Sequence, residues 1–132
     1  MASGPTARTL EMLHKEGYIA QVVERWNPWA QRKIDLFNCI DIIAVRPTRC
    51  SIVGIQCTTG SHHAVRRAKI LSEPKARAWL ECGGSIEIRS WSRRGGRGKR
   101  KKWEERVEEI TLEMFDGYED VCAGREEGAQ DG

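Results

Sequence analysis

Two neighbouring segments of the chain carry polar residues that could bind a metal ion. Asp41 stands at the head of the apolar run 42–45, and Gln56 lies within the run 52–57. A lone carboxylate at the start of a buried strand is costly to desolvate unless it binds a cation or a donor. If the two runs form a hairpin, Asp41 approaches Gln56 and Thr58. A carboxylate, an amide oxygen and a main-chain carbonyl suit Mg²⁺ or Mn²⁺, and such a metal could activate water for attack on a phosphate.

Basic residues follow these segments. Arg66, Arg67 and Lys69 form a short basic segment, which is either a solvated helix face or a set of phosphate contacts. Further along, residues 92–102 contain three glycines and seven cations, which are Arg93, Arg94, Arg97, Lys99, Arg100, Lys101 and Lys102. A flexible basic loop of this kind suits backbone phosphates but cannot read base sequence by itself.

Length and composition predict one globular domain. The chain has 132 residues, with 39% hydrophobic and 31% charged side chains, which suffices for a single core and is too apolar for a disordered chain. No apolar run approaches the roughly 20 residues that a membrane helix needs. Residues 1–12 lack the apolar segment of a signal peptide. We therefore expect a cytoplasmic protein with no membrane partner and no small-molecule cofactor.

The five cysteines are expected to be reduced thiols, because nothing in the chain signals export. No CxxC pair occurs, and the histidines are not at zinc-finger spacing, so a structural zinc site is not expected. Cys39, Cys57 and Cys82 have apolar neighbours in the sequence and are expected to fill the core.

Charge is unevenly distributed along the chain. Residues 1–102 hold 20 basic and 8 acidic residues, a formal charge of +12, whereas residues 103–132 hold 2 basic and 11 acidic residues, a formal charge of −9. A body this basic is typical of proteins that bind polyanions, and plain solvated surface is the alternative. We expect a single domain over residues 1–116 and an acidic flexible tail over residues 117–132.

The pattern of apolar residues predicts a mixed α/β fold. A helix starts near Thr6 and ends at Gly17, and further helical segments are predicted at 64–71 and 74–82. Strands are predicted at 18–26, at 34–45 with a bend near Asn38, and at 50–58, 85–91 and 103–115, the last with a helix as the alternative. The short link after residue 45 favours an antiparallel hairpin. The resulting order is an α-β-β-β-α-β core with an extra C-terminal strand, in which helices flank a mixed sheet.

Residues 27–33 are expected to form a loop, because Pro28 interrupts the pattern of the preceding strand. The adjacent Trp26 and Trp29 are expected to cover the edge of the sheet.

The segments "CIDIIAV" and "SIVGIQCT", joined by a turn, resemble the core of the PD-(D/E)XK nuclease superfamily. The predicted order of elements also resembles its restriction-endonuclease-like fold, with small Holliday-junction-resolvase-like and phage-type members as the nearest in character. The resemblance implies that Asp41 is the metal-binding aspartate and that Gln56 replaces the second acid. It further implies that the Cys57 carbonyl is a metal ligand. Glu11 on the first helix would complete the site, with a surface carboxylate as the alternative.

Thr58 occupies the position of that superfamily's catalytic lysine. A hydroxyl cannot supply positive charge to a phosphate under attack. Either the cation has migrated to Lys69, whose stem is flexible enough to reach back, or the site is inactive and the domain only binds nucleic acid. Asp35, Glu24 and His63 are secondary candidates for reaching the metal or the substrate, and ordinary turn, strand and loop positions are their alternatives.

The expected function is therefore that of a metal-dependent DNA endonuclease, with branched DNA as a candidate substrate. By analogy with resolvases, a homodimer that cuts both strands is expected. A catalytically inactive nucleic-acid-binding module on the same fold is the alternative. A structural or assembly protein of a mobile element is a third hypothesis.

Overall fold

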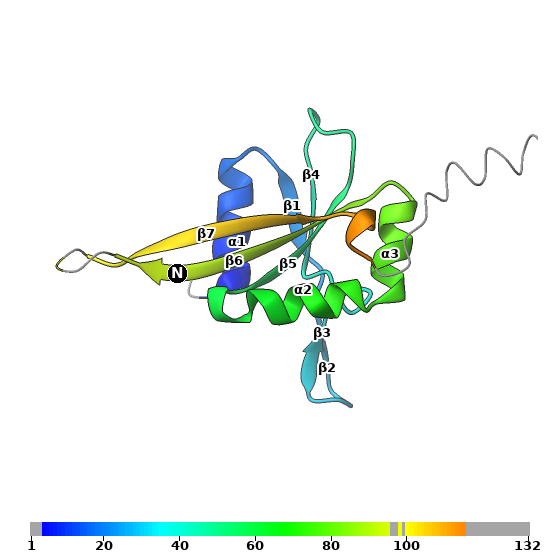
Figure 1. The fold of residues 1–132 in the computed structure, drawn as a ribbon, viewed down its shortest axis with the longest axis horizontal. Coiled ribbons are helices and arrows are strands. Elements are labelled where there is room, and N and C mark those ends of the chain that lie inside the picture. The colour runs from blue at the N-terminus through cyan, green and yellow to red at the C-terminus, as the bar shows by residue number, and fades with distance from the viewer. Residues whose placement is uncertain (1–3, 96–97, 99, 116–132) are drawn as a thin grey trace, which may run out of the picture.

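The computed structural model describes residues 4–95, 98 and 100–115 of the chain, and Figure 1 shows their arrangement. The helices are α1 (Pro5–Lys15), α2 (His63–Leu71) and α3 (Pro74–Glu81), with short 3₁₀ turns at Gly60–His62 and Leu112–Met114. The strands are β1 (Ile19–Val22), β2 (Arg25–Asn27), β3 (Arg32–Ile34), β4 (Ile42–Val45), β5 (Val53–Thr59), β6 (Ser85–Arg94) and β7 (Lys102–Ile110). The predicted mixed α/β class is confirmed.

Five strands form one mixed sheet in the order β1-β4-β5-β6-β7. β4 pairs antiparallel with both β1 and β5, β5 pairs in parallel with β6, and β7 returns antiparallel along β6. A parallel pair cannot be joined by a tight turn, and here α2 and α3 form the crossover between β5 and β6. The predicted antiparallel hairpin is confirmed as β4–β5, in which Ile42 lies opposite Ile55.

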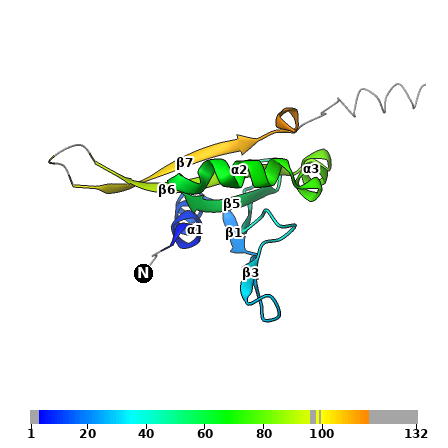
Figure 2. The same cartoon turned by 60° about the horizontal axis from the view of Figure 1, so that its bottom comes forward.

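Helices cover both faces of the sheet, as Figure 2 shows. On one face, Leu13 of α1 packs in a cluster with Ile55. On the other, Ile70 of α2 packs in a cluster with Ile86. Successive side chains on a strand point to opposite faces, so Gln56 points to the α2 side. The polar residues of β5 therefore share a face with the basic helix that follows them.

Residues 34–45 do not form one bent strand, because the bend predicted near Asn38 is a tight loop that separates β3 from β4. Phe37 and Asn38 adopt positive φ angles of 53° and 61°, a left-handed conformation that is uncommon for a residue such as phenylalanine. The side-chain amide of Asn38 donates to Glu73 Oε1 at 3.0 Å and so ties the loop to the start of α3. The loop turns Asp35 back toward the start of β4.

The expected strand over 18–26 and loop over 27–33 are also corrected. β1 ends at Val22, and β2 and β3 form a separate two-stranded hairpin that projects from the body (Figures 1 and 2). Trp26 and Trp29 do not cover the sheet edge, because they are 62% and 95% exposed.

The C-terminal part of the described chain is a strand, β7, so the helical alternative is wrong. Cys39 and Cys57 are buried as predicted, whereas Cys82 is exposed, so its assignment to the core is wrong. The predicted acidic tail over 117–132 lies outside the described residues. None of the described helices is long and apolar enough to cross a membrane.

Candidate metal centre

Asp41 is held in place from both sides at the start of β4. Its N–H donates to the Ile55 carbonyl and its carbonyl accepts from the Val23 N–H, both at 2.8 Å. Its carboxylate Oδ2 accepts hydrogen bonds from Gln56 Nε2 at 2.7 Å and from the Cys57 N–H at 2.8 Å. The β4–β5 hairpin therefore brings Asp41 and Gln56 together, and both side chains are buried.

Two further carboxylates, from Glu24 and Asp35, converge on Asp41. One oxygen of each of the three lies within 4.8 Å of the others. Asp35 reaches this acidic cluster from the loop after β3, where Gln56 Nε2 and Lys69 Nζ each lie 3.4 Å from its Oδ2. Glu24 reaches it from the link between β1 and β2. The cluster thus joins acids from three separate segments, with Lys69 beside Asp35 and with Lys33 Nζ 3.6 Å from Glu24 Oε1.

The carboxyl groups of Asp41 and Asp35 lie close enough to shift each other's pKa in opposite directions. Burial, together with the hydrogen bond and charge of Asp35, raises the pKa of Asp41 to about 9. The pKa of Asp35 is lowered: burial opposes this shift, but the hydrogen bond with Asp41 and the positive charge of Lys69 outweigh it. Two adjacent carboxyl groups resist joint ionisation unless a cation compensates them. The pair on its own therefore holds one proton at neutral pH, and Asp41 carries it.

The acidic cluster lines a cavity of about 710 Å³, which residues of α1, β3, β5 and α2 enclose. Thr58 and Thr59 add hydroxyl groups to its wall. Four cations also line it, namely Arg32, Lys33, Arg66 and Lys69. Carboxylates surrounded by cations suit a phosphate that is bound both through a metal ion and through charge-assisted hydrogen bonds.

The amide oxygen of Gln56 bears on whether these residues can hold a metal ion. Gln56 Oε1 is buried and has no hydrogen-bond partner among the described residues. A buried polar group left unpaired costs about 1–3 kcal/mol, and a cation beside it would remove that cost. The carboxylates of Glu24, Asp35 and Asp41 are hard oxygen donors like this amide, and such donors suit Mg²⁺ and Mn²⁺. The donor set therefore fits a divalent metal.

No protein-family model matches this chain, and no curated protein or solved structure is significantly similar to it. Thr58, which stands where the resemblance expects a lysine, is buried and lines the cavity. Lys69 reaches the acidic cluster from α2, with its Nζ 3.4 Å from Asp35 Oδ2.

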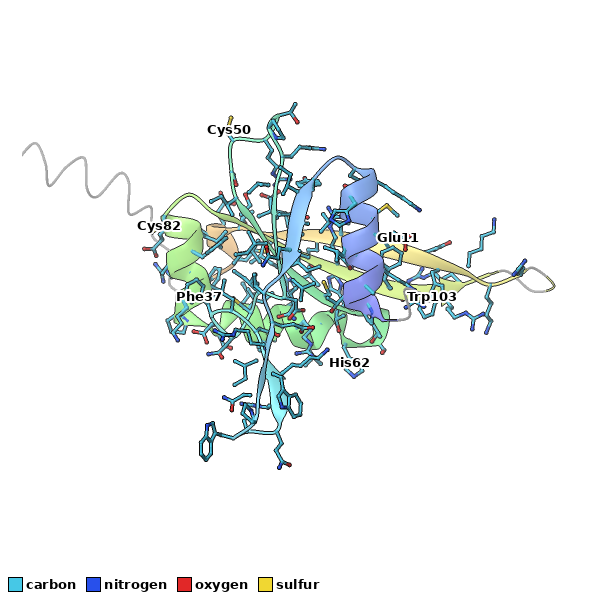
Figure 3. The ribbon with its side chains drawn as sticks, turned by 180° about the vertical axis from the view of Figure 1, so that it is seen from behind. Glu11, Phe37, Cys50, His62, Cys82 and Trp103 are labelled. Atoms are coloured by element: carbon cyan, nitrogen blue, oxygen red, sulfur yellow. The ribbon has the colours of Figure 1, made fainter. Side chains whose placement is uncertain are left out.

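The structure does not bring Glu11 to the acidic cluster. Glu11 lies on α1 (Figure 3), its side chain is 57% exposed, and its Oε1 pairs with Lys15 Nζ at 3.6 Å. This is the surface carboxylate that the sequence left as the alternative. Glu24 is the residue that adds a third carboxylate instead.

His63 also lies apart from the cluster, where it joins α2 to the sheet. Its Nδ1 lies 2.7 Å from Ser90 Oγ and its Nε2 lies 2.7 Å from Glu108 Oε1. Arg67 donates to the same carboxylate at 3.0 Å. Although burial opposes it, the His63 hydrogen bond and the charge of Arg67 lower the pKa of Glu108. His63 and Arg67 are thus tied into packing contacts, and the neighbouring His62 lines the cavity.

The described cations of the basic loop lie at the far end of the β6–β7 hairpin (Figure 1). Arg93 lies 5.7 Å from the centre of the Trp103 ring, and Arg94 Nε lies 4.0 Å from Glu104 Oε2. Three more cations are exposed, namely Arg100, Lys101 and Lys102. The remaining two, Arg97 and Lys99, lie outside the described residues. The loop can therefore contact phosphates that lie away from the cavity.

Arg32 and Lys33 were not expected in the site from the sequence. They line the cavity together with Ile34 and Asp35, because β3 is the strand of the β2–β3 hairpin that leads back to the body. Their position directly before Ile34 and Asp35 is the one local signal that could have revealed them, since cations beside a candidate metal ligand are suited to phosphate binding.

Proposed function

We propose that this protein is a metal-dependent DNA endonuclease of the PD-(D/E)XK type, built on a restriction-endonuclease-like fold. The observation that carries the proposal is the convergence of three carboxylates with the unpaired Gln56 oxygen in a cavity lined by cations. The order of elements supports it, because Asp41 starts one strand of a hairpin and Gln56 lies on the other.

Asp41, Asp35 and Gln56 would hold the divalent cation, with Glu24 and the Cys57 carbonyl beside them. The cation would supply a Lewis acid that polarises the phosphate and lowers the pKa of the attacking water. Asp41 must release its proton to become a ligand, because a carboxylate binds a metal in its ionised form.

Lys69 would supply the positive charge that Thr58 cannot. Its ammonium group already lies beside Asp35, so a phosphate held at the cluster would contact both a carboxylate-bound cation and an amine. Arg66 lies one turn earlier on α2 and lines the same cavity. The two cations would orient the phosphate and stabilise charge that develops on its oxygens. The Thr58 hydroxyl can add a hydrogen bond but no charge.

Thr58 is also the observation that favours a second candidate function, a nucleic-acid-binding module without catalysis. In that case the cavity cations and the basic loop would bind phosphates, and no bond would be cleaved. In either case DNA is the proposed partner. A homodimer would place two cavities on one DNA and so permit cleavage of both strands.

The proposal is tested by cleavage of linear duplex, branched and single-stranded DNA with and without Mg²⁺ or Mn²⁺. We expect Asp41→Asn to lose about 100-fold or more of the cleavage rate, as is usual when a group that binds the reacting charge is removed. Glu11→Gln removes the same charge from an exposed site and should cut at the wild-type rate. Undiminished cutting by Asp41→Asn would overturn the site. Salt-dependent binding without cleavage of any substrate would establish the binding module instead.

A further inference from the structure

The hairpin formed by β2 and β3 presents two tryptophans to solvent. Trp26 is 62% exposed and Trp29 is 95% exposed. Aromatic side chains stabilise a fold mainly through the large area that they bury, so Trp29 contributes little to folding. Large apolar side chains exposed together on a surface are typical of a binding site.

The tip of this hairpin has a defined shape. Asn27 Oδ1 accepts hydrogen bonds from the backbone N–H groups of Trp29 at 2.9 Å and Ala30 at 3.1 Å, a pattern that fixes turns. Gln31 then adopts a φ of 51°, and β3 returns in register with Asn27 opposite Arg32. Trp29 is thus displayed on an ordered turn, so little conformational freedom is lost when a partner binds.

The hairpin is cationic as well as aromatic. Residues 25–34 include Arg25, Arg32 and Lys33 and no acidic residue. Trp26 lies opposite Lys33 across the two strands, so an indole and an ammonium group share one face of the hairpin. Lys33 also pairs with Glu24 at the base of the hairpin. Nucleic acid complements this combination, because bases stack on aromatic rings while phosphates bind cations.

The hairpin also lies next to the proposed metal centre. A second cavity of about 500 Å³ is lined by Trp26, Trp29 and Phe37. Ile34 and Asp35 line both this cavity and the one that holds the acidic cluster. Figure 3 shows the hairpin projecting from the body of the molecule, open to solvent. A strand whose bases stack on the hairpin can therefore continue directly to the carboxylates.

We propose that the β2–β3 hairpin binds unpaired bases of the DNA strand that enters the cavity, so that DNA with a single-stranded segment is preferred over continuous duplex. This inference rests on the proposed function, because the hairpin serves the same cavity. In a continuous duplex the base faces are covered by their neighbours, and exposing one costs unpairing and unstacking energy. Binding an unpaired base avoids most of that cost.

The test compares the binding of labelled oligothymidine and of a blunt duplex, with Ca²⁺ replacing Mg²⁺. We expect Trp29→Ala to weaken oligothymidine binding about fivefold or more and to change duplex binding less than about twofold. Trp29→Phe should retain single-strand binding, since a phenyl ring still stacks. Ile19→Ala, which truncates a side chain that is 68% exposed on β1, should bind both DNAs as wild type does. Circular dichroism and thermal melting check that each variant folds.

Several results would overturn the hairpin inference. Equal losses on both DNAs, or no loss on either, would show that Trp29 does not bind bases. A smaller oligomer of Trp29→Ala by light scattering, with DNA binding unchanged, would assign the tryptophans to contacts between copies of the chain.

Cleavage assays separate this inference from the proposed function. If wild type binds single strands through Trp29 but cuts no DNA, the nuclease proposal fails and base binding by the hairpin stands. If wild type cuts DNA and Asp41→Asn does not, while Trp29→Ala keeps the wild-type substrate preference, the nuclease proposal stands and the hairpin inference fails.

Discussion

At neutral pH, the carboxyl group of Asp41 is protonated in the folded protein, whereas it would be ionised in the unfolded chain. Its pKa is raised from 3.8 to about 9, because it is buried and because Asp35 lies beside it. A raised native pKa means that the contribution of this group to stability is fully present below about pH 4 and is lost as the pH rises toward 9. We therefore expect the stability of the metal-free protein to fall across that range.

Replacing Asp41 by asparagine should remove this loss of stability at high pH. An amide has the shape of a protonated carboxyl group, and its oxygen can accept the hydrogen bonds from Gln56 and the Cys57 N–H. At about pH 8 in EDTA, we expect Asp41→Asn to be more stable than wild type by roughly 1–3 kcal/mol and to melt several degrees higher. The difference should vanish near pH 4. Thermal melts at both pH values measure it, and a less stable variant at pH 8 would mean that Asp41 is ionised in the fold.

Lys69 is the subject of the second prediction at the residue scale, because its ammonium group contacts Asp35 in the acidic cluster. Lys69→Met keeps the length of the stem and removes the charge. We expect single-turnover cleavage to slow about 100-fold or more, since a group that stabilises transition-state charge is lost. DNA affinity should change little, because many other cations remain.

The matched control for this variant is Lys15→Met, which removes an exposed lysine that pairs with Glu11 on α1. Its cleavage rate should equal that of wild type. If both variants slow cleavage equally, overall charge and not the position of Lys69 would be responsible. If Lys69→Met cuts normally, the missing lysine function lies elsewhere in the cavity.

At the scale of elements, the sequence predicts those parts whose signal is local. The β4–β5 hairpin follows from two apolar runs separated by a short turn, and the crossover follows from a helical pattern between two strands. The β2–β3 hairpin could not be predicted, because the segment "RWNPWAQRK" has no period of two and its tryptophans look like core residues. The sequence does indicate a bend near Asn38, but no local pattern shows that a left-handed Phe37 turns this bend into a loop between two strands.

The acidic cluster could likewise be predicted only in part from the sequence. Asp41 and Gln56 could be paired from the sequence because one hairpin carries both. Asp35 and Glu24 come close to them only through the loop before β4 and the link after β1, which are contacts that strand periodicity does not encode. The sequence favours Glu11 over Glu24 as the added carboxylate, and the structure reverses this order. Which of the two meets Asp41 depends on the link after β1, which no local pattern encodes.

Arg89 lies at the centre of a buried charge network that connects β6 with β7 and with the end of α1. Its replacement gives a prediction at the scale of elements. It lies on β6, is 3% exposed, and contacts Glu16 after α1, Glu87 on its own strand and Glu105 on β7. Removing one partner of a buried charge network leaves the others uncompensated. We therefore expect Arg89→Met to lower the free energy of unfolding by about 3–5 kcal/mol.

Urea denaturation measures this loss. Arg94→Met is the matched control on the same strand, because Arg94 and its partner Glu104 have side chains that are 70% and 61% exposed. An exposed pair contributes about 0–1 kcal/mol, so this variant should unfold close to the wild-type midpoint. Equal effects of the two substitutions would mean that the Arg89 network is solvated and weak.

At the scale of the whole molecule, cations gather in two places on the described chain. One group lines the cavity, and the other lies on the β6–β7 hairpin, which extends well beyond the body of the sheet (Figure 1). A nucleic acid that reaches the acidic cluster can therefore contact the long hairpin through phosphates at a distance. Such contacts add affinity without reading base sequence.

This arrangement predicts how binding depends on salt. Each phosphate contact adds about 0.9 to the slope of log affinity against log salt concentration for duplex DNA. Changing both Lys101 and Lys102 to glutamine should therefore reduce the slope by about 1–2, at most one contact for each lysine. The combined change Lys15→Gln and Arg77→Gln removes the same charge from α1 and α3, where both residues pair with acidic neighbours in their own helix. That control should leave the slope near its wild-type value. If both double variants reduced the salt slope equally, DNA binding would depend on net charge alone. Phosphate contacts along the β6–β7 hairpin require a larger reduction from the hairpin lysines than from Lys15 and Arg77.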